Sequence, residues 1–364
     1  MKKMLFILIS IIVLSLGTFV APSMAQDSDY YKKNKQKNLG TSKYRINGSS
    51  IDKKFLYPSS GKKGNIDVYM PEEKTTFTFT GDTPPYVSLL RTSAYSIQQL
   101  FDISQVDSDI KNRFELFKGR LKSRMSLWLS RASYYVPLMA EILAENGIPL
   151  EIVYLPLIES GFSTHAVSRA GATGQWQFMP FTARRYGLKI DKYVDERRDP
   201  EKATKAAAAY LKDLYAMFGD WNLALSSYNA GEGRVMNAVS STGIKDFWTL
   251  KQTTYLPSET RKYVPTFIAA AMIAHEPSKY GFSNVPYQKP MDFDLVMIET
   301  PMDLQVVAQL AEADKKTIRH LNPELKNNTT PLNVDFYLLR IPEGKRKIFF
   351  KNYLSYPKSA LLSM

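Results

Sequence analysis

The sequence feature that most constrains the fold of this chain is an apolar segment that ends at a single acidic residue. Residues 150–158 contain one charged residue, and Pro149 before them suits the first turn of a helix, where a backbone N–H would be unpaired anyway. The segment therefore predicts a short buried helix that Pro156 kinks or whose boundary it shifts. Glu159 follows, and Gly161 is the residue type that ends a helix in a left-handed turn.

Glu159 is thus expected at the C-terminal end of a hydrophobic helix, next to apolar side chains. Apolar surroundings disfavour a carboxylate and raise its pKa toward the range in which a carboxylic acid donates a proton near neutral pH. The glycine-rich stretch 170–174 permits a tight bend, which we expect to return Ser168, Gln177 and the Trp176 indole toward the acid. The pattern favours a general acid, and an acid that closes a helix end in solvent is the ordinary alternative.

Several of these residues resemble the ordered motifs of the soluble lytic transglycosylase family, lysozyme-like enzymes that cleave bacterial peptidoglycan. The resemblance covers roughly residues 85–345, and the run 194–200 resembles the membrane-bound D subgroup of that family. One departure is Gln175-Trp176, where the family commonly has Leu-Met. The four motifs contain Glu159, Ser160 and Gly161; Ser168 and Gln177; Tyr228 and Asn229; and Tyr263.

The resemblance implies a mainly α, lysozyme-like α+β fold and a peptidoglycan lytic transglycosylase activity on glycan strands. Glu159 would be the catalytic residue. It would protonate the glycosidic oxygen between N-acetylmuramic acid and N-acetylglucosamine and then take the proton of the C6 hydroxyl, leaving a 1,6-anhydro ring. The resemblance also places the Tyr263 hydroxyl beside the acid. It implies substrate-binding roles for Ser160, Ser168, Gln177, Tyr228, Asn229 and Tyr263.

Two other functions stay open. A hydrolytic muramidase needs a second carboxylate, and Glu232 and Asp195 are the nearest candidates by motif position. A non-catalytic peptidoglycan-binding protein would keep the groove without needing Glu159 protonated.

The N-terminus has the zones of an export signal. Two lysines follow Met1, an apolar run extends from Met4 to Val20, and Ala25 ends a small-residue site before Gln26. We expect cleavage near Gln26 and secretion to the periplasm or cell envelope of a bacterium. The alternative is that the run is retained as a membrane anchor, because its length approaches a thin bilayer.

Composition narrows the chemistry further. The chain has no cysteine, which excludes cysteine catalysis, disulfides and a thioether-linked lipid. His165, His275 and His320 lack metal-ligand spacing, so we predict no metal and no cofactor. The formal net charge of +13 favours the binding of polyanionic partners. Without a nucleic-acid motif, we expect cell-wall polymers or lipid headgroups rather than nucleic acid as partners, and the sequence leaves the oligomeric state undetermined.

We predict five segments: a signal peptide (1–25), a basic linker and N-terminal extension (26–84) with strand-like alternation at 65–85, a catalytic domain (85–290), a degenerate LysM-like module (291–345) and a tail (346–364). The module has the order strand, helix, helix, strand. It either binds the wall or caps the catalytic domain, and four basic residues favour binding: Lys315, Lys316, Arg319 and Lys326.

Helix boundaries are expected at particular residues of the catalytic domain. Asp199 and Asp220 should cap helices that run from Glu201 to Phe218 and from Trp221 to Tyr228. Before the Glu159 segment, the apolar periodicity indicates one helix through Leu129 and a second one from Val136 to Leu143, which Gly147 ends.

Overall fold

A computed structural model describes residues 86, 96–103, 108–357 and 361, and the backbone of residues 44–46 and 49–51. The expected signal peptide and the strand-like pattern at 65–85 lie outside these residues. Within the segment expected as a linker, β1 (Tyr44–Ile46) and β2 (Ser49–Ile51) pair antiparallel. This pair belongs to a unit formed by residues 1–75, and all the other described helices and strands belong to a second unit, residues 76–364.

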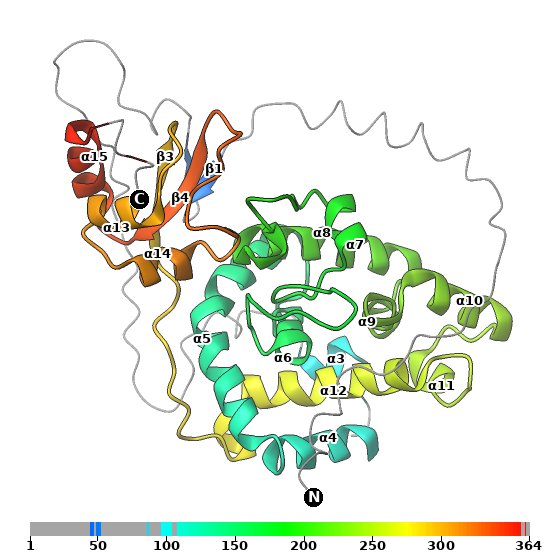
Figure 1. Ribbon diagram of the computed structural model, residues 1–364. Helices are drawn as coiled ribbons and strands as arrows, with labels where there is room; N and C mark the ends of the chain where they lie inside the picture. The colour runs from blue at the N-terminus through cyan, green and yellow to red at the C-terminus, as the bar shows by residue number, and fades with distance from the viewer. Residues whose placement is uncertain are drawn as a thin grey trace, which may run out of the picture. The chain divides into compact units, whose positions relative to one another are not determined.

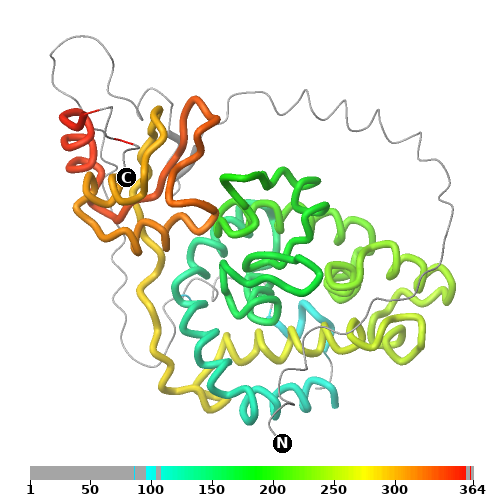
Figure 2. Tube along the Cα trace, viewed as in Figure 1, coloured from blue at the N-terminus to red at the C-terminus, as the bar shows by residue number. Residues whose placement is uncertain are grey.

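The second unit is mainly helical, as predicted, and most of its helices surround one hydrophobic core (Figures 1 and 2). The helix α12 (Ser258–His275) packs against α4, α6 and α9, while α5 (Lys122–Glu145) packs against α6 and α8. The elements of this part are α3 (Ile97–Leu100), α4 (Ser108–Lys118), α5, η2 (Leu150–Tyr154), α6 (Leu155–Ser160), α7 (Pro180–Arg185), η3 (Glu196–Arg198), α8 (Pro200–Phe218), α9 (Trp221–Ala230), α10 (Glu232–Thr242), α11 (Phe247–Leu250), α12 and η4 (Pro277–Tyr280).

The predicted helix caps are confirmed. The Asp199 carboxylate accepts two backbone N–H bonds of 2.9 Å in the first turn of α8, and the Asp220 carboxylate accepts one of 2.7 Å in the first turn of α9. Each such cap contributes about 1 kcal/mol to stability. The helix α9 continues two residues further than predicted, to Ala230, so that Asn229 is helical as well as Tyr228.

The long helix α5 differs from the prediction, which divided it in two. It is continuous from Lys122 to Glu145 with Pro137 inside, and the break lies earlier, between α4 and α5. Proline removes a helical hydrogen bond and crowds the preceding turn. Here Val136 and Met139 on either side of it are fully buried, and burial of a packed face outweighs a local preference.

The C-terminal part has the predicted order of elements. The strands β3 (Phe293–Ile298) and β4 (Tyr337–Pro342) pair antiparallel, and α13 (Leu304–Leu310) and α14 (Lys315–Leu321) lie between them in sequence. They enclose a second hydrophobic cluster. The helix α15 (Arg346–Ser355) falls in the segment expected as a tail, yet its Phe349 is fully buried in that cluster. We therefore propose that the module includes α15.

The C-terminal module contacts the helical part mainly at residues 191–199. Val194 bridges to Leu325, and the Lys326 N–H donates to the Tyr193 carbonyl at 2.8 Å. Arg340 of β4 donates to both carboxylate oxygens of Asp199 at 3.0 Å, and neither side chain is more than 6% exposed. The carboxylate that caps α8 therefore also binds the module.

Candidate active site

Local sequence places Glu159 at the end of a buried helix. The segment η2 passes directly into α6, with Pro156 in the first turn of α6, so the predicted boundary shift is confirmed. Gly161 ends α6 in the left-handed conformation with φ 59°, and a Cβ at this position would lie 2.1 Å from the Trp128 ring. Glycine is needed here for both its backbone and its size, and it ends the helix just after the acid.

Glu159 is paired with a tyrosine from α12. The Tyr263 hydroxyl donates a hydrogen bond to Oε1 of the partly buried Glu159 carboxyl. Loss of water around the carboxyl raises the pKa of Glu159 to about 7; the bond from Tyr263 lowers this pKa, and the negative charge of Glu259 raises it. A carboxyl with a pKa near 7 can donate a proton and take one back near neutral pH.

The glycine-rich bend folds back onto the end of α6. The Ser160 hydroxyl donates to the Gln175 carbonyl at 2.9 Å, which ties the bend to the residue beside the acid. Ser168 Oγ accepts the Ala172 N–H at 3.0 Å, and Gln177, with φ 50°, donates its side-chain amide to the bend's backbone. The three side chains expected to bind substrate thus also hold the bend, and all three are partly exposed to solvent.

The run 194–200, identified in the sequence only by resemblance, packs against the glycine-rich bend and binds its backbone. Gly174 has φ 84°, and a Cβ there would lie 1.8 Å from the Arg197 carbonyl oxygen. The Arg197 guanidinium donates to the carbonyls of Gly171 at 2.9 Å and Phe178 at 3.1 Å. Sequence reasoning missed this role of Arg197, because the arginine and the carbonyls it binds are brought together only by the fold.

The Trp176 indole, expected to turn toward the acid, is part of the hydrophobic core. The ring is fully buried, and its N–H donates to the Thr204 hydroxyl of α8 at 2.9 Å, so no face of the ring is open to solvent. A large ring gains more from burial than from a place in an exposed bend, provided its N–H finds a partner.

Tyr228 and Asn229 reach the site from the end of α9. The Tyr228 hydroxyl donates to the Trp176 carbonyl at 2.7 Å, and Asn229 Oδ1 accepts from the Thr260 hydroxyl of α12 at 2.9 Å. Burial raises the pKa of Tyr228, and the Glu159 carboxylate raises it further, which puts this ring close to the acid. The structure therefore brings α6, α9 and α12 together around Glu159.

A row of aromatic rings extends from Tyr228, and sequence reasoning missed it. The Tyr210 ring centre lies 5.2 Å from that of Tyr228, and the Tyr186 ring centre lies 5.0 Å from that of Tyr210. Tyr210 occurs on α8 at a position that its own periodicity marks as core, so no local signal distinguished it.

The two acids considered as a second carboxylate are both engaged elsewhere. Asp195 is buried, and its two carboxylate oxygens each accept from the Arg197 guanidinium at 2.8 Å. Glu232 accepts from the Tyr210 hydroxyl at 3.2 Å and from the Arg185 guanidinium at 3.3 Å. Within the described part of the chain, no group of three or more acidic, histidine or cysteine side chains is arranged to hold a metal ion.

Two segments of the chain match known protein families. Residues 138–251 match the transglycosylase SLT domain. Residues 292–358 match the LysM-like domain of the lytic transglycosylase MltD. The resemblance drawn from the motifs is therefore confirmed. The SLT match includes Glu159 and the other residues expected to bind substrate, except Tyr263, which α12 supplies from beyond its end.

This chain matches only part of the length of its relatives. Membrane-bound lytic murein transglycosylase D of Escherichia coli (strain K12) is 36% identical over 204 residues, which are 55% of this chain and 44% of that protein. The peptidoglycan transglycosylase gp16 of Escherichia phage T7 is 39% identical over 95 residues, 25% of this chain and 7% of that protein. The chain thus spans less than half the length of these relatives.

Solved structures include the 70 kDa soluble lytic transglycosylase of Escherichia coli, which is 22% identical and covers 55% of this chain and 34% of its own, with a TM-score of 0.36. The Slt lytic transglycosylase of Pseudomonas aeruginosa is 27% identical and covers 42% of this chain and 25% of its own, with a TM-score of 0.34. In the residues that the structure describes, every helix is too short or too polar to cross a membrane.

Proposed function

We propose that this chain is a peptidoglycan lytic transglycosylase that cleaves glycan strands without a cofactor. The observation that carries the proposal is the Glu159–Tyr263 pair: an acid with a pKa near 7, inside the region that matches the SLT domain, is held by a tyrosine hydroxyl from α12. Relatives named as lytic murein and peptidoglycan transglycosylases support the same substrate.

In this mechanism one carboxyl serves two proton transfers. Protonated Glu159 donates its proton to the glycosidic oxygen between N-acetylmuramic acid and N-acetylglucosamine as that bond breaks, and the substrate's acetamido oxygen bonds to C1. The Glu159 carboxylate then takes the proton of the C6 hydroxyl while the C6 oxygen displaces the acetamido oxygen at C1. The product carries a 1,6-anhydro ring, and no water is consumed.

Tyr263 positions the Glu159 carboxyl and stabilises its charged form. Its hydroxyl holds one carboxyl oxygen in place and stabilises the carboxylate that exists between the two transfers. We propose that Ser160, Ser168, Gln177, Tyr228 and Asn229 bind the sugar residues on either side of the cleaved bond. Tyr228 offers a ring face, and the serines and amides offer hydrogen bonds from the bend and from α9.

A hydrolytic muramidase is the alternative that one observation favours. Water-using glycosidases need a second carboxylate. Asp195 and Glu232 are engaged by arginine, but Glu259 lies one turn before Tyr263 on α12, and its charge acts on Glu159. If water is the nucleophile, Glu259 is the residue to activate it.

The Glu159→Gln variant tests the catalytic assignment. The amide keeps the size of the side chain but has no transferable proton, so we expect cleavage of purified peptidoglycan to fall by about 100- to 10,000-fold. Binding to the insoluble wall should persist in a pull-down assay. The matched control is Glu115→Gln, which changes an exposed acid on α4 and should leave the rate unchanged. Near-normal cleavage by Glu159→Gln would contradict the assignment.

We further propose that the chain is exported and acts in the bacterial cell envelope, in turnover and remodelling of the wall. The zones of residues 1–25 support export, and the relatives named as membrane-bound support an envelope location. N-terminal sequencing of the protein recovered from the envelope should begin near Gln26. A retained Met1 would establish an N-terminal anchor instead.

A further inference from the structure

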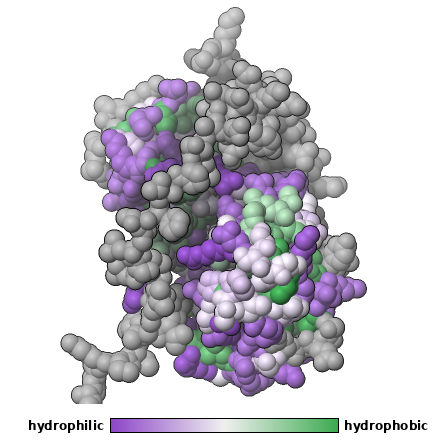
Figure 3. Space-filling model, turned by 90° about the vertical axis from the view of Figure 1, so that its right-hand side faces the viewer, coloured by the Kyte–Doolittle hydropathy of each residue, from purple (hydrophilic) through white to green (hydrophobic). Residues whose placement is uncertain are grey.

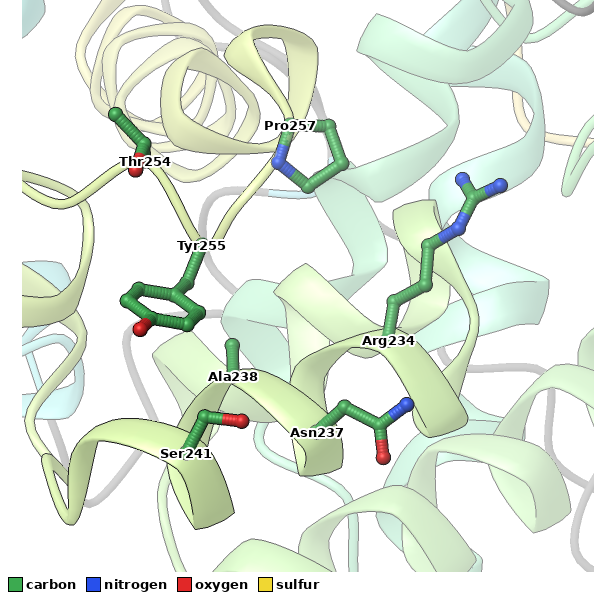
Figure 4. Close-up of a pocket in the computed structure, with 7 residues that line it drawn as sticks. All are labelled: Arg234, Asn237, Ala238, Ser241, Thr254, Tyr255 and Pro257. Carbon is green, nitrogen blue, oxygen red and sulfur yellow. The ribbon is translucent and has the colours of Figure 1, made fainter. Parts of the chain in front are cut away.

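A cavity of about 400 Å³ lies between α10 and the segment that leads into α12 (Figure 4). In Figure 4 the side chains of Arg234, Asn237 and Ser241 project from α10 on one side, and Thr254 and Tyr255 stand on the other. Pro257, the N-cap of α12, closes the far edge. None of the residues assigned above to catalysis or sugar binding lines this cavity.

Three polar side chains of the lining have no partner among the described residues. Across the described parts of the chain, no ion pair or hydrogen bond engages the side chains of Arg234, Asn237 or Ser241. Two other arginines of the helical part are paired with carboxylates: Arg185 binds Glu232, and Arg197 binds Asp195. Pro257, the N-cap of α12, lines the cavity and supplies no capping side chain, and the first turn of that helix carries the acid Glu259.

One edge of the cavity lies on the helix that carries Tyr263. Pro257 precedes Tyr263 by six residues, and a helix rises 1.5 Å per residue, so the cavity edge lies about 9 Å from the Tyr263 position along α12. The hydrogen bond from the Thr260 hydroxyl to Asn229 joins the intervening turn of α12 to the chain just before α10. The cavity edge and the Glu159–Tyr263 pair are therefore less than two helical turns apart along α12.

The surface around the cavity is not purely polar. Tyr255 is 56% exposed and Met236 of α10 is 45% exposed. Figure 3 shows the face that carries α10 and α11, where hydrophobic patches interrupt a hydrophilic surface. A ligand that suits this lining is anionic and carries both amide groups and short aliphatic parts.

We infer that this cavity binds the peptide stem that peptidoglycan carries on its muramic acid residues, with a stem carboxylate on Arg234. This inference rests on the proposed function and names a second contact for the same substrate. The planar guanidinium fork matches a carboxylate, Asn237 and Ser241 match the peptide groups, and the Tyr255 ring packs on the aliphatic part of the stem.

The test compares two substrates with the full-length protein. One is a preparation of glycan strands that keep their peptide stems, and the other is the same preparation after an amidase has removed the stems. We expect Arg234→Gln to lower kcat/KM on the stem-bearing strands by about tenfold or more, mainly through KM, because a hydrogen-bonded charge is lost. On the stripped strands the variant and the wild type should then differ little.

The control variant is Lys245→Gln, which removes a positive charge from the loop after α10 without touching the cavity. It should behave as the wild type on both substrates. An equal loss on both substrates for Arg234→Gln, or no loss on stem-bearing strands, overturns the inference and leaves the proposed function standing. A wild type that cleaves neither substrate overturns both. Unchanged melting temperatures of the two variants exclude loss of folding as the cause.

Discussion

At the scale of single residues, the site depends on one carboxyl whose environment could be anticipated only in part. The apolar run before Glu159 correctly predicted desolvation as the main influence on its pKa. The hydrogen bond from Tyr263 to Glu159 could be predicted only from the family resemblance, because the two residues are 104 positions apart in the sequence. The charge of Glu259 was not anticipated, because nothing in the local sequence shows that the first turn of α12 faces α6.

The raised pKa of Glu159 predicts a dependence of stability on pH. The folded protein binds this proton more tightly than the unfolded chain, whose value is near 4.5. The stability so gained is complete below pH 4.5 and is lost as pH rises through about 7. Between about pH 4.5 and pH 8, the free energy of unfolding of the wild type should fall by about 1–3 kcal/mol relative to Glu159→Gln.

Urea denaturation of both proteins at several pH values measures this difference. Other titrating groups change both proteins alike, so they cancel in the comparison. A difference that stays constant from pH 4.5 to pH 8 would show that the carboxyl has an ordinary pKa in the folded protein.

At the scale of elements, the sequence predicted the helix ends that depend on neighbouring residues. The caps Asp199 and Asp220 and the left-handed end of α6 were correct, because each depends on residues within one turn. The continuity of α5 through Pro137 was missed, since tertiary burial decides it. The second role of Asp199, as partner of Arg340, was also beyond sequence reasoning, because the two residues lie 141 positions apart.

The Arg340 cluster predicts a large loss of stability when its cation is removed. Burial raises the pKa of Glu324 to about 7, and the charge of Asp199 raises it further, so the guanidinium compensates at least two buried carboxyl groups. Removing one partner of a buried pair costs about 3–5 kcal/mol. Arg340→Leu should therefore lower the free energy of unfolding by about that amount.

Denaturant unfolding measures this loss, and Arg346→Leu is the control. The Arg346 guanidinium lies 3.9 Å from Asp294, and both side chains are partly exposed, so its removal should cost less than about 1 kcal/mol. Equal, small effects of the two substitutions would mean that the buried cluster does not stabilise the junction.

At the scale of the whole described unit, the charges of the LysM-like module are partly used by the protein itself, and one of them reaches the helical part. Three of the basic residues expected to meet the wall bind groups of the protein. The Lys326 ammonium donates to the Asp191 carbonyl at 2.6 Å, the Arg319 guanidinium donates to the Asn327 carbonyl at 2.8 Å, and Lys315 lies 3.6 Å from Asp303. The sequence showed the charges but not their partners, so it left the choice between wall binding and capping open.

In the proposed reaction the substrate's own C6 hydroxyl, and not water, completes what Glu159 begins. Digestion of purified peptidoglycan in water enriched in oxygen-18, followed by mass spectrometry of the new glycan ends, distinguishes the two nucleophiles. We expect 1,6-anhydro-muramic acid ends that carry no label. Reducing ends that carry oxygen-18 would contradict the proposed reaction and would identify a hydrolytic muramidase in which a second carboxylate such as Glu259 activates water.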